Sequence, residues 1–263
     1  MTKTPIKALI ADDSSTICRL VERALRKTGR RFQFTIATDG QQAIEALAKT
    51  AFDIAFLDIN MPQMSGIDVM ESIHEAGSKT FAISMSDKLS EDAEQKLKAF
   101  GAYDFLSKPF SPEQVQQIIQ TYEALKANYD ILIVDDSATV RKIVEKVLQR
   151  SIFNLDIDHA HNGASAIEAI QNKSYRIIFT DFNMPGMSGI ELAEKIQTFR
   201  QGGDVIVMST EMNETLDKAA QRVGARAFLR KPFYPEDVDS ILHHLFQLRH
   251  SHFSKQVRMF AMA

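Results

Sequence analysis

The sequence contains two copies of one pattern, and this duplication constrains the fold more than any other feature. The acidic pair Asp12-Asp13 recurs 123 residues later as Asp135-Asp136. Further landmarks keep the same displacement: Asp58 and Asp181, Ser86 and Ser209, Gly101 and Gly224, and Lys108 and Lys231. A constant displacement over the whole unit indicates a duplicated domain rather than a solenoid of short repeats. The 263 residues therefore divide into two domains of about 120 residues each.

Apolar runs alternate with segments of helical periodicity in both copies. In the first copy we expect strands at 6–11, 32–37, 53–57, 80–85 and 103–106, and helices at 14–28, 40–49, 66–75, 91–100 and 112–127. In the second copy we expect strands near 131–134, 155–159, 176–179, 205–208 and 227–229. Right-handed crossovers make such strands parallel. The predicted fold class is α/β, with two flavodoxin-like (βα)5 domains, each a five-stranded parallel sheet of order 2-1-3-4-5 with helices on both faces.

The predicted domain boundaries follow from these elements. We expect a first domain at 1–127, a second at 128–249 and a tail at 250–263. The tail has no strand pattern and is too short for another domain. We expect it to be disordered or to begin a linker, although Phe253, Val257 and Phe260 fall at helical spacing.

Composition excludes several classes of function. The net charge of -3, with mixed signs along the chain, offers no basic field for nucleic acid. The first apolar run ends at Asp12, too early for a signal peptide or a membrane span. We therefore expect a cytoplasmic protein with no nucleic-acid and no membrane partner. The single cysteine, Cys18, is expected to be a small helix residue rather than a nucleophile.

Acidic residues follow two strands that end at the same sheet edge. The pair Asp12-Asp13 comes after the first strand and Asp58 ends the third, and the second copy repeats this with Asp135-Asp136 and Asp181. Asp commonly caps helices, so one isolated pair would favour a structural role. The repeated spacing favours a cluster instead, and an oxygen-only cluster suits Mg²⁺, one ion per domain.

A cation and a hydroxyl complete the predicted site in each copy. Lys108 and Lys231 follow the fifth strand, and Ser86 and Ser209 end the fourth. A carboxylate nucleophile beside a metal, a lysine and a hydroxyl is suited to accepting a phosphoryl group as an aspartyl-phosphate. The chain has no GxxxxGK[ST] loop and no GxGxxG after the first strand, so a nucleotide is not the expected ligand.

These motifs resemble the receiver domain of bacterial two-component response regulators, twice in tandem. The resemblance is carried by Ala-Asp-Asp-Ser and Val-Asp-Asp-Ser, by the Asn-Met-Pro-x-Met-Ser-Gly that follows each single Asp, and by Lys-Pro-Phe. It covers about residues 5 to 248, and motifs in this order and spacing are highly specific to that family.

The resemblance implies a role for each site residue. Asp58 and Asp181 would accept the phosphoryl group from a histidine kinase or phosphotransfer protein. The Mg²⁺ ligands would be Asp12, Asp13, Asp58 and Asn60 in one domain and Asp135, Asp136, Asp181 and Asn183 in the other. Ser86 and Ser209 would be switch hydroxyls, Lys108 and Lys231 ion-pair partners of the phosphate, and Phe105 and Phe228 switch aromatics. The resemblance also implies cis peptides at Lys108-Pro109 and Lys231-Pro232.

Two departures from the family pattern matter. The residue after the switch hydroxyl is usually small in receivers, but here it is Asp87 or Thr210. An acidic side chain there would alter the phosphorylation kinetics of the first domain. Phe105 and Phe228 stand where Tyr is often found, which removes a hydroxyl and keeps the ring. We expect both receivers to be competent.

Alternatives from other classes fit less well. A phosphatase with an Asp nucleophile needs a second Asp two residues later, where this chain has Asn60 and Asn183. A degenerate dimerisation domain would have lost a site residue in one copy, and none is lost. We therefore expect a phosphoacceptor signalling protein rather than a classical enzyme.

The output is the open question in the sequence. One hypothesis is a tandem receiver that acts on a downstream protein target, as a phosphorelay intermediate or adaptor, with dimerisation possible. The alternative is the N-terminal regulatory part of a longer response regulator whose output enzyme, such as a diguanylate cyclase, is missing from this chain. His243-His244 is expected to be a solvent-facing pair rather than a phosphorylation site.

Overall fold

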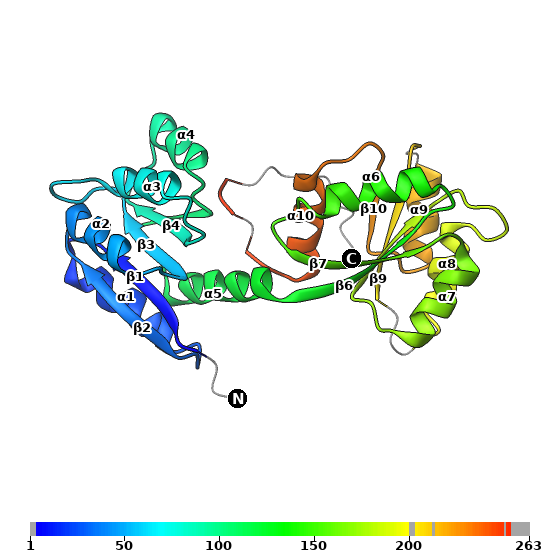
Figure 1. Ribbon diagram of the computed structural model, residues 1–263, viewed down its shortest axis with the longest axis horizontal. Coiled ribbons are helices and arrows are strands. Elements are labelled where there is room, and N and C mark those ends of the chain that lie inside the picture. Colours follow the sequence, from blue (N-terminus) through cyan, green and yellow to red (C-terminus); the bar gives the residue numbers. More distant parts are fainter. Residues whose placement is uncertain (1–3, 200–202, 212–213, 250, 254–263) are drawn as a thin grey trace. The chain divides into compact units, whose positions relative to one another are not determined.

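A computed structural model describes residues 4–199, 203–211, 214–249 and 251–253 (Figure 1). The chain divides into two compact units. The first comprises the residues up to Tyr122 together with Arg249 and the described residues that follow it, and the second is Glu123–Leu248. The boundaries expected after residues 127 and 249 stay predictions. The part of the predicted tail at 250 and 254–263 lies outside the described residues.

The first unit alternates strands and helices, and the residues of its last helix after Tyr122 fall in the second unit. Its elements are β1 Ile6–Ala11, α1 Ser15–Arg26, β2 Phe32–Ala37, α2 Gly40–Lys49, β3 Ile54–Asp58, α3 Gly66–Glu75, β4 Phe81–Ser86, α4 Glu91–Ala99, β5 Asp104–Ser107 and α5 Pro112–Lys126. The five strands pair in parallel in the order β2-β1-β3-β4-β5. This confirms the predicted strand order.

The second unit repeats the same topology. Its elements are β6 Asn128–Val134, α6 Ala138–Leu148, β7 Asn154–Ala160, α7 Gly163–Asn172, β8 Ile177–Asp181, α8 Gly189–Ile196, β9 Asp204–Ser209, α9 Glu214–Arg222, β10 Ala227–Arg230 and α10 Pro235–Leu245. The parallel order β10-β9-β8-β6-β7 is the first sheet's order read from the other edge. Each unit therefore has the predicted flavodoxin-like fold.

The central strands are buried on both faces, which is why they read as continuous apolar runs. In β1, Ala8 and Ile10 join a core cluster with residues of α1 and α5, whereas Leu9 and Ala11 join one with residues of α2, α3 and α4. The second unit has the same two clusters, one with α6 and α10 and one with α7, α8 and α9. Figure 1 shows helices on both faces of each sheet.

The strand registers bring the ends of β1, β3, β4 and β5 to one edge of the sheet. Ala11 pairs with Leu57, Asp58 with Met85, and Ser86 with Ser107. The second unit has the same registers at Val134 with Thr180 and at Asp181 with Met208. The residues just beyond these pairs therefore meet at one edge, as in other open α/β sheets.

The structure corrects one expectation from the sequence. His243 is buried, with its ring edge-on to Phe153, so the expectation of a solvent-facing pair is wrong for this residue and holds for the exposed His244.

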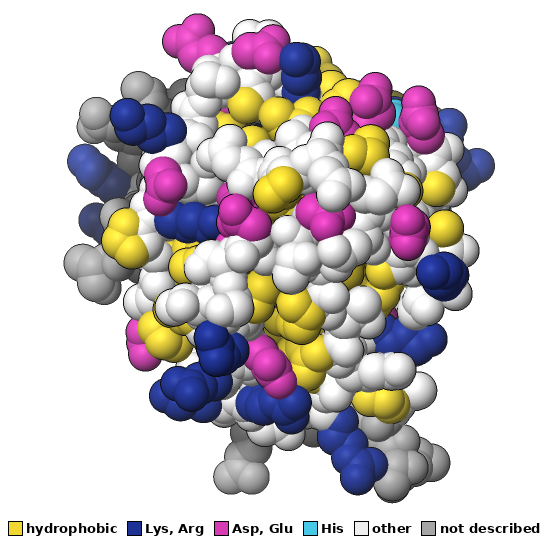
Figure 2. Space-filling model, turned by 90° about the vertical axis from the view of Figure 1, so that its left-hand side faces the viewer, with side chains coloured by type: hydrophobic (Ala, Val, Ile, Leu, Met, Phe, Trp, Pro, Cys, Tyr) yellow, Lys and Arg dark blue, Asp and Glu magenta, His cyan; other side chains and the backbone are white. Residues whose placement is uncertain are grey.

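No helix within the described ranges is long and apolar enough to cross a membrane. On the face drawn in Figure 2, acidic and basic side chains are interspersed with apolar ones.

Candidate functional site

In the first unit, the predicted acidic residues meet at the carboxyl edge of the sheet. Asp12 follows β1 and is fully buried, Asp58 ends β3 and is 3% exposed, and Asp13 is exposed. One carboxylate oxygen from each of the three lies within 4.8 Å of the others. Asp12 and Asp58 are both buried and close together, so their negative charges need a positive charge nearby.

Lys108 supplies that charge. Its Nζ lies 2.7 Å from Asp12 Oδ2 and 3.0 Å from Asp58 Oδ2. The residue directly follows β5, where its backbone N–H donates to the carbonyl of Ser86 over 2.8 Å. The Lys108-Pro109 peptide is cis, as expected, and so is Lys231-Pro232. The lysine is therefore positioned by the end of the strand next to β4.

Burial and pairing set the charges in this cluster. Burial raises the pKa of the Asp58 carboxyl, Lys108 opposes this, and the Asp12 carboxylate adds to it. Burial lowers the pKa of Lys108, but pairing with Asp12 and Asp58 outweighs it, so the pKa of Lys108 is raised overall. The lysine therefore stays cationic at neutral pH.

Ser86, one of the predicted switch residues of the first unit, is connected to Asp58 through Asn60. Ser86 is fully buried at the end of β4, and its Oγ accepts from the Asn60 side chain over 3.0 Å. The Asn60 N–H donates to Asp58 Oδ1 over 3.3 Å. Phe105 is 5% exposed, so its ring lies inside the unit, whereas Asp87 is exposed.

The second unit has the same arrangement of ion pairs. Lys231 Nζ lies 2.7 Å from Asp135 Oδ2 and 2.6 Å from Asp181 Oδ1. The Asn183 N–H donates to Asp181 Oδ2 over 3.0 Å. Burial raises the pKa of Asp181, with Lys231 opposing it. Ser209 is buried at the end of β9 and Phe228 in β10.

The two sites differ in their acidic pairs. Asp136 is exposed, and the described part of the second unit has no three-carboxylate group as close as that of Asp12, Asp13 and Asp58. Arg141 Nη1 donates to the Asp135 carbonyl over 2.6 Å, whereas at the equivalent position the Cys18 thiol donates to the Asp12 carbonyl over 3.4 Å. Burial raises the pKa of Cys18 to about 11, so this thiol is neutral at physiological pH.

The donor set of the first unit fits Mg²⁺. Asp12, Asp13 and Asp58 offer only oxygen atoms, and one of the three is exposed, which leaves room for water ligands. Mg²⁺ characteristically takes a few carboxylates and keeps several waters. The residues present therefore match the expected metal in kind.

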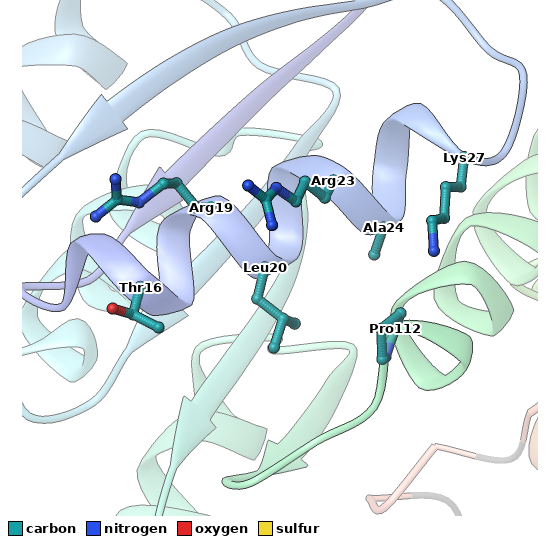
Figure 3. Close-up of a pocket in the computed structure, with 7 residues that line it drawn as sticks. All are labelled: Thr16, Arg19, Leu20, Arg23, Ala24, Lys27 and Pro112. Atoms are coloured by element: carbon teal, nitrogen blue, oxygen red, sulfur yellow. The ribbon is translucent and has the colours of Figure 1, made fainter.

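A groove lies between α1 and the start of α5 in the first unit. It is lined by Thr16, Leu20 and Ala24, with Pro112 opposite, and by an exposed row of basic side chains, Arg19, Arg23 and Lys27 (Figure 3). Residues four apart share one face of a helix, so the three cations form a continuous stripe. The helix starts two residues after Asp13, so Arg19 is the member of the stripe nearest to the acidic pair in the sequence.

Two of these contacts were not predicted from the sequence. Asn60 was expected only as a Mg²⁺ ligand, and its side chain also donates to the Ser86 hydroxyl. Arg141, which contacts the backbone of Asp135, was not expected in the site. Comparing the copies position by position could have found the second contact, because Arg141 stands where the first copy has Cys18.

Two flavodoxin-like domains, each with a strand-end Asp paired with a Lys and a buried Ser at one sheet edge, define the class of receiver-like signalling domains. The family model for the response regulator receiver domain matches residues 8–120 and again 131–243. The chain therefore belongs to the response regulator receiver family, with two such domains in tandem.

Relatives support the same assignment. The chain is similar to the chemotaxis protein CheY homolog of Campylobacter jejuni, with 32% identity over 109 residues, 40% of this chain and 83% of the relative. It is similar to chemotaxis protein CheY1 of Helicobacter pylori, with 31% identity over 109 residues, 40% of this chain and 87% of the relative. A structure described as a probable two-component system response regulator/GGDEF domain protein shares the fold, with a TM-score of 0.60, 23% identity and coverage of 92% of this chain and 98% of its own.

Proposed function

We propose that this cytoplasmic chain is a signalling protein with two phosphorylatable receivers. Asp58 and Asp181 each accept a phosphoryl group from a histidine kinase or phosphotransfer protein. The observation that carries this proposal is the same in both units: one lysine Nζ within 3.0 Å of both the strand-end Asp and the first Asp of the acidic pair. The paired lysine favours the anionic form of this carboxylate, which is the form that acts as a nucleophile.

The transfer is a single displacement at phosphorus. An oxygen of the Asp58 carboxylate forms a bond to phosphorus, the bond from phosphorus to the donor atom breaks, and its electron pair leaves with the donor. The product is a mixed anhydride on Asp58. Lys108 neutralises the phosphoryl oxygens, and Asp12 and Asp13 would hold the Mg²⁺, with the Asn60 carbonyl as a further ligand. When bound, Mg²⁺ offsets the charge that gathers on the phosphoryl oxygens.

Signalling would follow from a change in population. Ser86 ends β4 and Phe105 lies in the neighbouring β5, so a hydroxyl drawn towards the phosphoryl group changes the packing between these strands. The same pair in the second unit is Ser209 and Phe228. A downstream protein target would read the altered surface.

Phosphorylation is tested with acetyl phosphate and Mg²⁺ and intact-protein mass measurement. We expect two phosphoryl groups on the wild type, one on Asp58→Asn or Asp181→Asn, and none on the double variant. Asp53→Asn, a control at the opposite end of β3, should leave both groups in place. Acid-stable phosphorylation of the double variant would contradict the proposal.

The basic stripe on α1 suits the acidic surface of a protein donor. The paired change Arg19→Glu and Arg23→Glu should slow transfer to Asp58 from a phosphorylated protein donor by about tenfold or more, as expected for reversed steering charges. Transfer from acetyl phosphate should be unchanged. Equal slowing with both donors would place the defect in the site rather than in docking.

The alternative, in which these residues regulate an output enzyme on a longer chain, uses the same phosphoacceptors. It predicts the same phosphorylation results and differs only in what reads them.

A further inference from the structure

A buried carboxylate at the start of β5 belongs to no part of the phosphoacceptor site. Asp104 is 1% exposed, and its Oδ1 accepts the N–H of Phe105 over 2.8 Å. Burying a carboxylate costs free energy of folding unless the carboxylate is paired with a cation and hydrogen-bonded. The other groups that pair with Asp104 show which segment of the chain covers this surface.

Those partners come from residues that follow the second receiver in the sequence. Arg249 Nε donates to Asp104 Oδ2 over 2.8 Å, and the His252 N–H donates to Asp104 Oδ1 over 2.6 Å. Among the described residues, Arg249 is the cation that pairs with Asp104. Arg249 and the described residues after it, Ser251–Phe253, are called the return segment below and belong to the first unit.

The return segment also uses the free edge of β5. Ser251 Oγ donates to the Tyr103 carbonyl, and Arg249 Nη2 donates to the Phe105 carbonyl over 3.3 Å. β5 is the last strand of its sheet, so its outer carbonyls would otherwise face solvent or another chain. Backbone groups of an edge strand are a common binding template for short peptides.

Aromatic contacts extend the covered surface. The His252 ring lies 5.6 Å from the Phe105 ring, centroid to centroid. Phe253 packs against the apolar cluster that contains Leu97 of α4, and Lys98 Nζ lies 5.7 Å above its ring. The return segment therefore combines one charged anchor with apolar contacts on α4 and β5.

The second receiver provides an internal comparison. At the position equivalent to Asp104 it has Ala227, which is buried at the start of β10. The fold thus tolerates alanine there, and the acidic anchor is particular to the first receiver. A buried carboxylate whose cationic partner lies 145 residues away is consistent with a dedicated recognition site.

We propose that the return segment is an intramolecular competitor that occupies the α4–β5 surface of the first receiver. A partner that presents an arginine followed by an aromatic side chain would bind this surface only after the segment leaves. Because the segment is tethered, its effective concentration is high and weakens any competing peptide. The contacts involve Tyr103, Asp104 and Phe105 rather than the acidic cluster, so the test requires no phosphorylation and is independent of the proposed function.

The test measures binding of a synthetic peptide with the sequence of residues 248–254 to the full chain by NMR titration. Arg249→Glu should release the tethered segment by repulsion from Asp104 and leave the site intact. We expect the peptide to bind this variant about tenfold or more tightly than the wild type. Arg31→Glu makes the same charge change on a distant exposed residue and should bind as the wild type does.

Asp104→Ala copies the second receiver and should fold. It should release the segment, read as faster amide exchange of Phe253, whose N–H donates to Ser251 Oγ and not to Asp104, and it should not bind the peptide. Equal peptide binding by the wild type and Arg249→Glu, or strong binding by Asp104→Ala, would overturn the proposal. Absence of binding to a folded Arg249→Glu chain would also overturn it.

Discussion

At the scale of single residues, each site depends on one lysine. Lys108 and Lys231 each bridge two carboxylates at distances of 3.0 Å or less. Their side chains are 12% and 15% exposed, so the pairs are largely shielded from solvent screening. Removing one partner of such a pair leaves buried charge uncompensated.

Lys108→Ala should therefore lower the free energy of unfolding of the first receiver by about 3 kcal/mol. Mg²⁺ should restore part of the loss, because it would replace the missing positive charge between Asp12 and Asp58. Urea denaturation with and without Mg²⁺ measures both effects. Lys49→Ala, at an exposed position, should change little, and an unchanged midpoint for Lys108→Ala would contradict the assigned role.

Asp239 predicts a pH dependence of stability. Burial raises its pKa to about 6, although Ser151 and the Ile152 N–H oppose this by donating to Oδ1. Relative to the unfolded chain, the folded protein thus favours the protonated form of Asp239. The contribution to stability is complete below pH about 4, the pKa of an unfolded Asp, and is lost as the pH rises through about 6.

Asp239→Asn should remove this dependence. The wild type should lose about 3 kcal/mol relative to the variant between pH about 4 and about 7. Denaturant unfolding across this range tests it, with the variant at each pH as the reference for all other titrating groups. Parallel curves for the two proteins would contradict the assignment.

At the scale of elements, the loop from β3 to α3 has no spare room. A Cβ on Gly66 would lie 2.2 Å from the carbonyl oxygen of Asp58, and a Cβ on Gly189 would lie 2.2 Å from that of Asp181. The clash is with backbone, so the loop itself would have to move. This explains why the Met-Ser-Gly of each copy ends in glycine, the residue that has no Cβ.

Gly66→Ala should destabilise the first receiver by about 1–3 kcal/mol, the usual cost of overpacking. It should also slow phosphorylation of Asp58 and leave that of Asp181 unchanged. Gly189→Ala should produce the mirror result. Rates from time-resolved intact mass measurement, combined with peptide mapping, test this; equal slowing at both residues would contradict it.

The regular elements could be predicted because their apolar periodicity is local. β1, β2, α2 and α3 have the predicted bounds. β6 begins three residues earlier than expected, because Asn128, Tyr129 and Asp130 pair with the start of β7 without an apolar pattern to signal it. Strand pairing between polar residues is set by the partner strand, which a local pattern does not contain.

The site was predictable to the extent that its residues recur. The duplicated Asp, Lys and Ser positions located both sheet edges, and the structure brings them together. Asp104 was missed, because an acid at a strand start resembles a turn residue and its partner Arg249 is far away in sequence. The sequence contains one sign of its special role: the second copy has Ala227 at the position equivalent to Asp104.

At the scale of the whole molecule, the two receivers share a fold and differ in their charges. Arg141 brings a guanidinium to the backbone of Asp135, where the first receiver has the neutral Cys18. We expect the first receiver to bind Mg²⁺ more tightly, by roughly threefold for one nearby partly screened charge. Arg141→Ala should reduce the difference in an NMR titration with Mg²⁺; tighter binding by the second receiver would contradict this.

We propose Asp58 and Asp181 as the two phosphoacceptors. The most direct measurement treats the chain with acetyl phosphate and Mg²⁺, reduces it with borohydride and maps the peptides by mass spectrometry. Borohydride converts an acyl-phosphate on Asp to homoserine, which marks the modified residue. We expect homoserine at positions 58 and 181, and at neither when Mg²⁺ is chelated. Homoserine at other aspartates, or at none, would contradict it.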